Sequence, residues 1–259
     1  MMNRTSLIVF SKNRPMQCDL MLKSIKCMAG DYSKIDIYVL YDASNLEYKE
    51  AYEICEKENT GANFISQELF YLDLKSLTEN LLSDFYFFCT DDTIFIREFL
   101  IRDIEEVFDN NIDLLNFSLR LGKNTYYCYP LLSQQKIPDF KEDGNILYWD
   151  WRGAHHDFGY PLEVSSSIMR SYDIDRFIES WTFSNPNKME WFMDTSKHSL
   201  ASRYTSACYP LSVAFSAPMN KVEISNTNRA SNRSTYSIEN LLEKYNNGYR
   251  INPYKFYIQ

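Results

Sequence analysis

The stretch FFCTDDTIF places two adjacent carboxylates, Asp91 and Asp92, directly behind an apolar run of strand length at residues 85–89. Burying two such charges is costly unless they are paired or bound to a cation. A hard divalent metal ion that carries phosphate oxygens would balance them. The alternative is that the two aspartates only cap the turn into the next helix. Because that alternative explains one aspartate better than two, we favour a metal and phosphate site.

Further polar residues follow the other apolar runs of the first half. In chain order they are Ser11, Asn13, Arg14, Asp42 and Arg120. Ligands bind at the carboxyl ends of the strands in parallel α/β sheets, so we expect these side chains at one edge. Arginine forks suit phosphate geometry, and Arg229 or Arg233 near the C-terminus could add donors. The alternative for any single arginine is an exposed residue that only improves solubility.

A carboxylate or histidine that could act as a general base comes later in the chain. The candidates are Glu190, Asp157, His155, His156 and Asp150. We favour Glu190, because NPNKMEWFM predicts a helix, with Asn187 as its cap, and a helix holds a side chain firmly. Trp191 and Phe192 are expected to anchor this helix. The alternative for Glu190 is an exposed helix carboxylate.

The run His155-His156-Asp157 invites interpretation as a metal site. Adjacent residues on a strand point to opposite faces, however. The only other histidine in the sequence is His198. We therefore give a histidine-based metal site little weight and assign Asp157, in a stretch rich in glycine and aromatic residues, to the shape of a binding pocket.

Strand and helix signals alternate over the first 120 residues, where short apolar runs predict strands and helical periodicity predicts helices. The strands are expected at 6–10, 35–41, 63–66, 85–89 and 114–119, and the helices at 20–28, 46–57, 72–82 and 98–108. Strands that alternate with helices imply right-handed crossovers and parallel pairing. We therefore predict an α/β fold in which helices flank a mainly parallel sheet.

The pattern becomes less regular in the second half. Strand-like pieces occur at 146–151 and 163–169, helices at 172–181 and 187–193, a strand-rich stretch at 207–225 and a last helix at 237–245. The sequence contains no internal repeat and no linker. We predict one domain over residues 1–259, with residues 1–124 as its regular half and 125–259 as an elaborated half.

Composition narrows the class of protein. The 259 residues are 45% hydrophobic, which excludes a disordered chain. The six cysteines are scattered and no apolar run is long enough for a membrane span or a signal peptide core, so we expect a cytoplasmic protein. The net charge of −8 argues against nucleic acid as a partner. Residues 196–259 are nonetheless basic, with eight Lys/Arg and three Asp/Glu, which suits a solvated face, a phosphate-bearing substrate or an anionic membrane.

These motifs together resemble the GT-A glycosyltransferases, which use nucleotide sugars. FSKNRP is similar to their opening strand and loop, Asp42 to the residue that contacts the base, and FFCTDDTIF to their DxD region, with Thr90 at its first position. FSLRLGKN resembles the following segment of exostosin-type members. WDWRGAHHDFGYPLEVSSSIMR resembles the acceptor-side region in outline, and SNPNKMEWFM the late helix that presents an acidic residue.

The resemblance implies a role for each candidate. Asp92 would hold Mn²⁺ or Mg²⁺, and Glu190 and Asp157 would act at the reaction centre. The nucleotide sugar, a UDP-sugar in preference to a GDP-sugar, would contact Ser11, Asn13, Arg14, Asp42, Asp91 and Arg120. Nearby aromatic residues would stack on a sugar or belong to the core, which is their commoner role. They are Trp149, Trp151, Phe158 and Tyr160.

The function expected from this resemblance is metal-dependent transfer of a hexosyl or N-acetylhexosaminyl group to a glycan or lipid-linked acceptor, as in polysaccharide biosynthesis. The basic C-terminal segment would allow peripheral association with the inner face of the membrane. Two alternatives remain open. One is a metal-dependent hydrolase built on Asp91, Asp92 and the His-His-Asp run, and the other is a nucleotide- or glycan-binding module without turnover.

Overall fold

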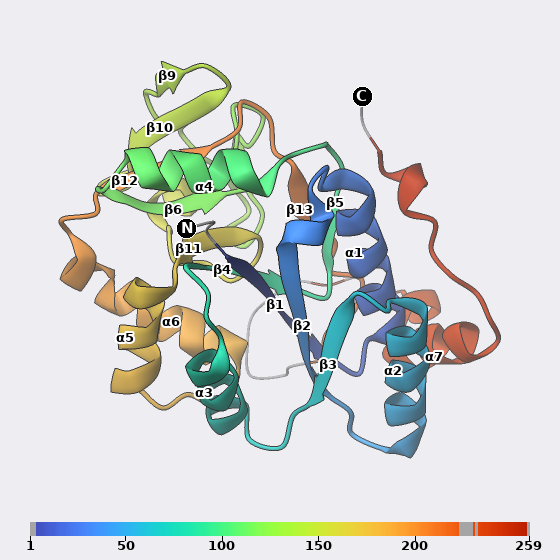
Figure 1. Ribbon diagram of the computed structural model, residues 1–259. Helices are drawn as coiled ribbons and strands as arrows, with labels where there is room; N and C mark the ends of the chain where they lie inside the picture. Colours follow the sequence, from blue (N-terminus) through green and yellow to red (C-terminus); the bar gives the residue numbers. More distant parts are fainter. Residues whose placement is uncertain (1–3, 223–229, 231–232, 258–259) are drawn as a thin grey trace.

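A nine-stranded mixed sheet forms the centre of the molecule in the computed structural model, which describes residues 4–222, 230 and 233–257 (Figure 1). Across the sheet the order is β3 (Ala62–Ser66), β2 (Ile35–Asp42), β1 (Thr5–Lys12), β4 (Phe85–Thr90), β11 (Ser167–Arg170), β6 (Leu114–Ser118), β12 (Thr205–Cys208), β10 (Ile146–Asp150) and β9 (Lys141–Asp143). Only β11 and β10 run against the direction shared by the other seven described strands. The predicted α/β fold with a mainly parallel sheet is confirmed.

Helices cover both faces of this sheet, as the alternation of buried residues along β1 requires. Leu7 and Val9 pack into one apolar core and Ile8 and Phe10 into the other. The first core is covered by α1 (Pro15–Met28), α2 (Leu46–Glu58), α4 (Ile101–Asn110) and α7 (Ile238–Asn246), and the second by α3 (Phe70–Asn80), α5 (Ser171–Ser180) and α6 (Pro186–Ser196) (Figure 1).

Shorter elements connect these layers. The small strands are β5 (Thr93–Phe95), β13 (Ala214–Ser216), β7 (Tyr127–Cys128) and β8 (Ser133–Gln134), which pair as β5 with β13 and β7 with β8. Single 3₁₀ turns occur at Tyr32–Lys34, His156–Gly159, Lys197–Leu200, Ser234–Tyr236 and Pro253–Lys255. No helix of the described residues is both long and apolar enough to cross a membrane.

Three predicted boundaries are wrong for local reasons. The first helix begins at Pro15 rather than residue 20, because proline suits the first helical position. The helix expected from residue 98 begins at Ile101, where the Asp31 carboxylate accepts hydrogen bonds from two free backbone amides. The strand expected from residue 163 begins at Ser167, because Ser166 has a φ of 86°, outside the strand region.

The larger difference concerns β11. It inserts between β4 and β6 and pairs antiparallel with both. As a result its amino end, and the loop that precedes it, lie at the same edge as the carboxyl ends of β4 and β6. The second half of the chain therefore delivers side chains to the edge where the first half ends its strands.

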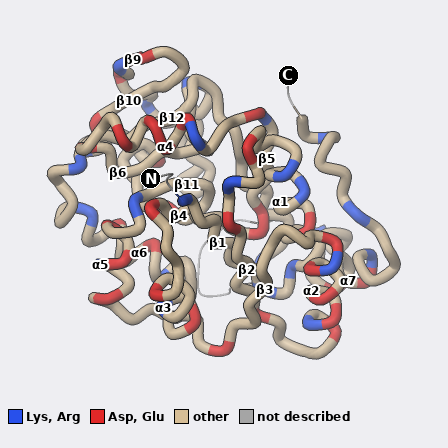
Figure 2. Tube along the Cα trace, in the orientation of Figure 1, with Lys and Arg blue, Asp and Glu red and all other residues tan. Residues whose placement is uncertain are grey.

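Ion pairs fasten the C-terminal part to the rest of the molecule. Glu58, at the end of α2, pairs with Lys23 of α1 at 2.9 Å and with Arg250 beyond α7 at 2.6 Å. Figure 2 shows acidic and basic residues close together where α2 approaches α7. The Arg250 hydrogen bonds are the largest cause that lowers the pKa of Glu58, to about 2. Part of the basic charge of residues 196–259 is therefore used inside the fold.

Candidate active site

The carboxyl ends of β1, β2 and β4 form the first half of the site. Lys12 lies opposite Asp42 and Phe10 opposite Thr90 in the strand register, so the loops after these strands begin at the same level. The predicted candidates of the first half, from Ser11 to Asp92, consequently gather at this edge. The sequence prediction of which side chains meet there agrees with the arrangement of the strands.

Asp91 is an internal structural group in this arrangement. Its side chain is only 3% exposed, and both carboxylate oxygens have protein partners. Arg14 Nη1 donates to Oδ1 at 2.9 Å, while Ser11 Oγ and the Lys12 amide donate to Oδ2 at 2.9 and 3.3 Å. Burial raises the pKa of Asp91, and Arg14 opposes that rise. Asp91 therefore fixes the loop that follows β1.

Arg14 provides the cation that the two adjacent carboxylates require. Beyond its contact with Asp91, its Nη1 lies 3.7 Å from Asp92 Oδ2. Its Nε donates to Asn220 Oδ1 at 2.8 Å, and its Nη2 donates to the Asn220 carbonyl. Burial by itself would lower the pKa of Arg14, but Asp91 and Asp92 outweigh it and raise the pKa. The guanidinium thus joins the first half of the chain to its C-terminal part.

Two members of this network, Tyr52 and Asn220, are absent from the sequence prediction. The Tyr52 hydroxyl lies 2.5 Å from Ser11 Oγ and accepts a hydrogen bond from the Arg14 amide at 3.0 Å. The buried Asn220 donates from Nδ2 to the Tyr236 carbonyl at 2.9 Å. Tyr52 belongs to a helix whose pattern reads as ordinary amphipathic packing, so no signal in the sequence distinguishes it.

Asp92 is the more available of the two aspartates. Its side chain is 16% exposed, and Oδ1 accepts from Thr90 Oγ1 at 2.8 Å. The two aspartates lie in the tight turn between β4 and β5, ten residues before α4 begins. They do not cap a helix, and the alternative that they only cap one is wrong.

Whether these residues can bind a divalent metal ion depends on which carboxylate oxygens of Asp91 and Asp92 are still available. Among the described residues no group of three or more His, Cys, Asp or Glu side chains is arranged to hold a metal. Asp91 is fully engaged, which leaves Asp92 Oδ2 as the carboxylate oxygen that this pair can offer. Magnesium and manganese prefer several oxygen ligands. The residues therefore fit a metal ion only when a bound diphosphate supplies most of the other oxygens.

Asn13 and Asp42 shape the outer part of the same edge. Asn13 has a φ of 52°, a conformation that asparagine tolerates better than most residues. Its amide donates to the Asp42 carbonyl at 3.0 Å, and its Oδ1 accepts from the Ser44 amide at 2.9 Å. The Asp42 carboxylate pairs with Lys12 at 2.9 Å and remains 29% exposed. Both residues are thus held together next to the open end of β2.

A second cluster lies around Arg120, just after β6. Its Nη1 is 3.5 Å from Asp157 Oδ1, and its Nε is 3.9 Å from Glu163 Oε2. Although Nε is buried, it has no hydrogen-bond partner among the described residues. Burial would lower the pKa of Arg120, but Glu163, Asp157 and Glu190 outweigh it and raise the pKa. The structure thus brings the predicted Arg120, Asp157 and Glu190 together.

Glu163 is the residue of this cluster that sequence reasoning missed. It is 3% exposed and lies in the loop before β11. Its Oε2 accepts from the Ser165 amide at 2.6 Å, and its Oε1 accepts from Ser167 Oγ at 2.7 Å. A glutamate between Leu162 and Val164, in PLEVSSS, was the available signal, because an isolated charge in an apolar run needs a partner.

Glu190 is delivered by α6. Asn185 caps this helix by accepting from the Lys188 amide at 2.9 Å, and Pro186 follows it. The predicted cap, Asn187, is wrong, because that residue already lies inside the helix. Of the two predicted anchors, Phe192 packs against the second core, whereas Trp191 is 54% exposed and does not anchor the helix. The buried residues Met189 and Met193 hold the helix as well.

The surroundings of Glu190 change its acidity. Burial is the largest cause that raises its pKa to about 7, and the negative charge of Glu163 adds to it. Tyr160, Arg120 and the Val164 amide act in the opposite direction. A carboxyl group with a pKa near 7 exists in both forms at neutral pH, which is the property of an efficient general base.

The two clusters lie on either side of the end of β4. Cys89 is fully buried near that end, and the pKa of its thiol responds to charges in both clusters. Burial is the largest cause that raises the pKa of its thiol, and Glu163 from one cluster and Asp92 from the other add to the rise. The site therefore consists of two halves, one around Arg14 and Asp92 and the other around Arg120 and Glu190.

The remaining candidates lie elsewhere. His156 Nε2 is 3.0 Å from Ser133 Oγ, and His155 Nδ1 accepts from the Lys136 amide at 3.2 Å, so both rings face the β7–β8 hairpin. Asp150 pairs with Arg152 at 2.6 Å. Trp149, Trp151 and Phe158 are core residues. Arg229 lies outside the described residues, and Arg233 directly precedes a 3₁₀ turn.

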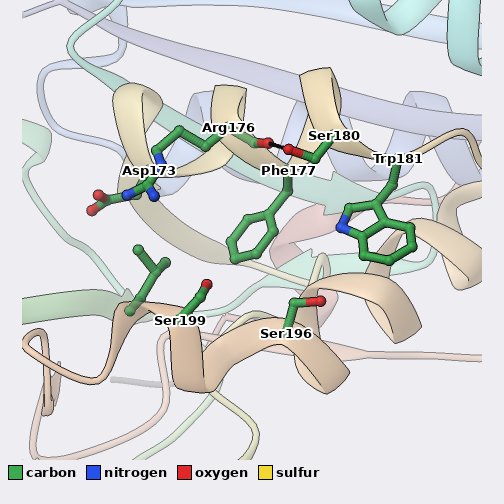
Figure 3. Close-up of a pocket in the computed structure, with 8 residues that line it drawn as sticks. Asp173, Arg176, Phe177, Ser180, Trp181, Ser196 and Ser199 are labelled. Atoms are coloured by element: carbon green, nitrogen blue, oxygen red, sulfur yellow. Dashed lines mark hydrogen bonds between the residues drawn. The ribbon is translucent and has the colours of Figure 1, made fainter.

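A cavity of about 320 Å³ lies apart from this site, between α5 and the end of α6 (Figure 3). On one side of the cavity lie Phe177 of α5 and Trp181, the residue just after α5. They face Ser196, at the end of α6, and Ser199 in the following 3₁₀ turn (Figure 3). None of the predicted site residues lines this cavity. Its position gives it no part in the chemistry of the two clusters.

Comparison with known proteins places this fold in a class. The chain is similar to S. aureus TarS residues 1–349 in complex with UDP-GlcNAc, with a TM-score of 0.55 and 13% identity over 98% of this chain and 69% of that one. It is also similar to the mannosyltransferase PcManGT from Pyrobaculum calidifontis in complex with GDP-Man and Mn²⁺, with a TM-score of 0.52 and 11% identity over 84% and 58% of the two chains. The fold is that of the GT-A glycosyltransferases, as the sequence resemblance indicated.

A curated protein is similar in sequence as well. The bifunctional glycosyltransferase pgtA of Dictyostelium discoideum is 27% identical over an alignment of 192 residues, and the match covers 68% of this chain and 25% of that protein. This chain thus corresponds to about a quarter of the length of that relative. No protein-family model matches the chain.

Proposed function

We propose that this protein is a glycosyltransferase that moves a sugar from a nucleotide diphosphate sugar to an acceptor hydroxyl. The observation that carries the proposal is Glu190, whose pKa is about 7 and whose charge interacts with that of Arg120, the residue just after β6. The similarity to pgtA, a glycosyltransferase, supports the same class of reaction. The GT-A-like fold supports a donor site at the ends of β1, β2 and β4.

In the proposed reaction, Glu190 accepts the proton of the acceptor hydroxyl as its oxygen attacks the anomeric carbon. The bond between that carbon and the diphosphate oxygen breaks, and a nucleoside diphosphate leaves with its electron pair. Glu190 then returns the proton to solvent. The developing negative charge of the leaving group needs nearby cations. Arg14, held between Asp91 and Asn220, and Arg120, whose Nε makes no hydrogen bond among the described residues, are cations placed for that role.

We propose Asp92 as the protein ligand of a divalent metal ion, Mn²⁺ or Mg²⁺. Its available Oδ2 and its position after β4 support this assignment, and the similar PcManGT is described in complex with Mn²⁺. Such an ion would stabilise negative charge on the diphosphate. Asp91 supports the site indirectly, because it fixes Arg14 and the loop after β1.

The donor and acceptor follow from the rest of the site. Ser11, Asn13 and Asp42 would border the nucleoside, and the donor would be a UDP-sugar or a GDP-sugar, because the two similar structures hold UDP-GlcNAc and GDP-Man. The transferred group would be a hexosyl or N-acetylhexosaminyl unit. The acceptor would be a glycan or a lipid-linked sugar of polysaccharide biosynthesis, reached from the Asp157 side. The cytoplasm and the inner face of the membrane, approached by the basic C-terminal segment, suit such an acceptor.

A product assay separates this proposal from its alternatives. The protein is incubated with UDP- and GDP-sugars, Mn²⁺ and a panel of sugar acceptors, and the released nucleoside diphosphate and free sugar are quantified. A transferase releases the diphosphate in proportion to an acceptor-linked product. A hydrolase releases equal free sugar without acceptor, and a binding module binds nucleotide without turnover. Either of the last two results would refute the proposed function.

A further inference from the structure

The β7–β8 hairpin exposes a concentration of large apolar side chains that the proposed reaction does not use. Residues 126–134, called here the 126–134 hairpin, include five large apolar residues with exposed fractions from 45% to 64%. These residues are Tyr126, Tyr127, Tyr129, Leu131 and Leu132. Pro130 between them is exposed too. A contiguous exposed apolar patch of this kind marks an interaction surface, in contrast to apolar residues exposed singly.

The charges around the hairpin indicate what it contacts. Residues 124–135 contain no Lys, Arg, Asp or Glu, and the exposed Lys123 and Lys136 flank them. Lys123 Nζ pairs with Glu142 at 2.7 Å, whereas Lys136 has no acidic partner among the described residues. Leucine side chains gain free energy in hydrocarbon, whereas tyrosine places its ring in the apolar zone and its hydroxyl in water. Lysines beside such a tip attract anionic head groups. An apolar tip beside the cation of Lys136 therefore fits the surface of an anionic lipid bilayer.

A glycan is a poorer match for the same surface. Sugar rings stack on aromatic faces, but their hydroxyls also need polar side chains as partners. Three of the exposed residues at the tip, Pro130, Leu131 and Leu132, offer no side-chain hydrogen bond. Leu132 also has a φ of 49°, so the turn holds an apolar side chain outward in a conformation unfavourable for leucine.

The hairpin is fixed to the half of the site around Arg120 and Glu190. Gln135 is buried at its base, where its Nε2 donates to the Thr125 carbonyl at 2.7 Å and its Oε1 accepts from the Asp157 amide at 3.0 Å. Ser133 Oγ is 3.0 Å from His156 Nε2. Asp157, in turn, pairs with Arg120. A surface that receives the hairpin tip would therefore lie close to the side of the site that takes the acceptor.

We propose that the 126–134 hairpin docks this protein on an anionic lipid bilayer, with Leu131 and Leu132 entering the apolar zone and Lys136 at the head groups. This docking surface differs from the basic C-terminal segment. In that segment, Lys197, Arg203 and Arg250 are already paired with Asp194, Asp173 and Glu58. The acceptor-facing orientation rests on the proposed function, whereas the docking itself does not.

The test is co-sedimentation of the full chain with vesicles of phosphatidylcholine containing phosphatidylglycerol. Wild type is compared with the double variant Leu131→Ser/Leu132→Ser. The matched control is Leu82→Ser/Ile112→Ser, which removes two leucine- or isoleucine-sized groups that are 80% and 78% exposed elsewhere. Circular dichroism and melting temperature establish that each variant is folded. No nucleotide sugar is present, so failure of the glycosyltransferase proposal cannot change the result.

We expect the hairpin variant to lose at least tenfold in vesicle affinity, because it removes two leucine side chains that the bilayer would bury. The control variant should bind as wild type does. Lys136→Gln should weaken binding to the anionic vesicles about fivefold and leave binding to pure phosphatidylcholine unchanged. The proposal is overturned if wild type does not bind the vesicles. Equal binding by the hairpin variant and the control would overturn it as well.

Discussion

Glu190, the proposed general base, has a pKa of about 7, and its charge interacts with that of Arg120. We expect Glu190→Gln to lower turnover at least about 100-fold with donor affinity nearly unchanged. The same variant should raise the melting temperature at pH 8, because it removes a carboxylate whose ionisation destabilises the fold. Steady-state kinetics and thermal melting measure the two effects. Wild-type turnover in this variant would exclude Glu190 as the base.

Asp157 serves as the comparison for Glu190. It pairs with Arg120 and lies in a short 3₁₀ turn beside the 126–134 hairpin rather than on an α-helix. Asp157→Asn should therefore raise the KM for the acceptor and leave kcat largely intact. Kinetics with varied acceptor decide between the two residues. If Asp157→Asn abolishes turnover at saturating acceptor and Glu190→Gln does not, their roles are reversed.

The pH dependence of the reaction should follow the same carboxyl group. Glu190 must be ionised to accept a proton, so turnover should rise with pH and level off above about 7. Burial raises this pKa first and Glu163 adds to it, while Arg120, Tyr160 and the Val164 amide lower it. Glu163→Gln removes the adjacent negative charge, so the rise should move to lower pH. A profile of kcat/KM that keeps its midpoint in this variant would contradict the assignment.

Glu190 also affects stability, with the sign set by its raised pKa. The folded protein binds the proton of Glu190 more tightly than the unfolded chain does. The stabilisation that protonated Glu190 provides is therefore complete at pH values below the ordinary glutamate pKa, and it disappears as pH rises through about 7. Wild type should therefore lose stability relative to Glu190→Gln over that interval. Urea unfolding at pH 5 and pH 8 measures the difference.

The two adjacent aspartates should respond differently to the same change. Asp92→Asn removes the proposed metal ligand and should abolish transfer with the fold intact. Asp91→Asn weakens a buried pair with Arg14 and should lower the free energy of unfolding by about 3 kcal/mol. Turnover in excess Mn²⁺ and urea unfolding measure these effects. Wild-type turnover of Asp92→Asn would show that Asp92 is not the metal ligand.

At the scale of elements, α6 positions Glu190 through a cap that the sequence does not identify uniquely. NPNKME offers two asparagines, and the one before Pro186 is the cap, because proline suits the first helical position. Asn185→Ala should lower the free energy of unfolding by about 1 kcal/mol. Asn187→Ala, two residues on, should have almost no effect. Equal losses in urea unfolding would contradict this capping geometry.

The predictable elements were those formed by local pattern. Apolar runs and helical periodicity are properties of neighbouring residues, and the alternation of strands with helices brought Ser11, Arg14, Asp42 and Asp91 to one edge. The position of β11 depends instead on pairing with β6, about fifty residues earlier in the chain, and with β4, which lies further back. Glu163 reaches the site through the loop that precedes β11. Sequence reasoning missed this carboxylate because the position of β11 is not a local property of the chain. Asn220 was missed for the same reason, since its contact with Arg14 spans 206 residues.

At the scale of the molecule, the fold separates two tasks. The regular half ends its strands around Arg14 and Asp92, and the second half returns through β11 and α6 to add Glu163 and Glu190. The division at residue 124 stays a prediction, although the Arg14–Asn220 contact shows that the two parts share one network. A site assembled from both halves suits a reaction that joins a donor to a separate acceptor.

The most direct test of the donor site is thermal melting with a nucleoside diphosphate and Mn²⁺, alone and together. Asp91 is fully engaged and Asp92 offers a single oxygen, so metal and diphosphate should bind as a pair. Ligand at about 100 times its dissociation constant should add about 2.7 kcal/mol, seen as a higher melting temperature. We expect UDP or GDP with Mn²⁺ to stabilise wild type more than either ligand alone, and Asp92→Asn to lose this gain. No stabilisation of wild type by any common nucleoside diphosphate with Mn²⁺ would contradict the proposed donor site.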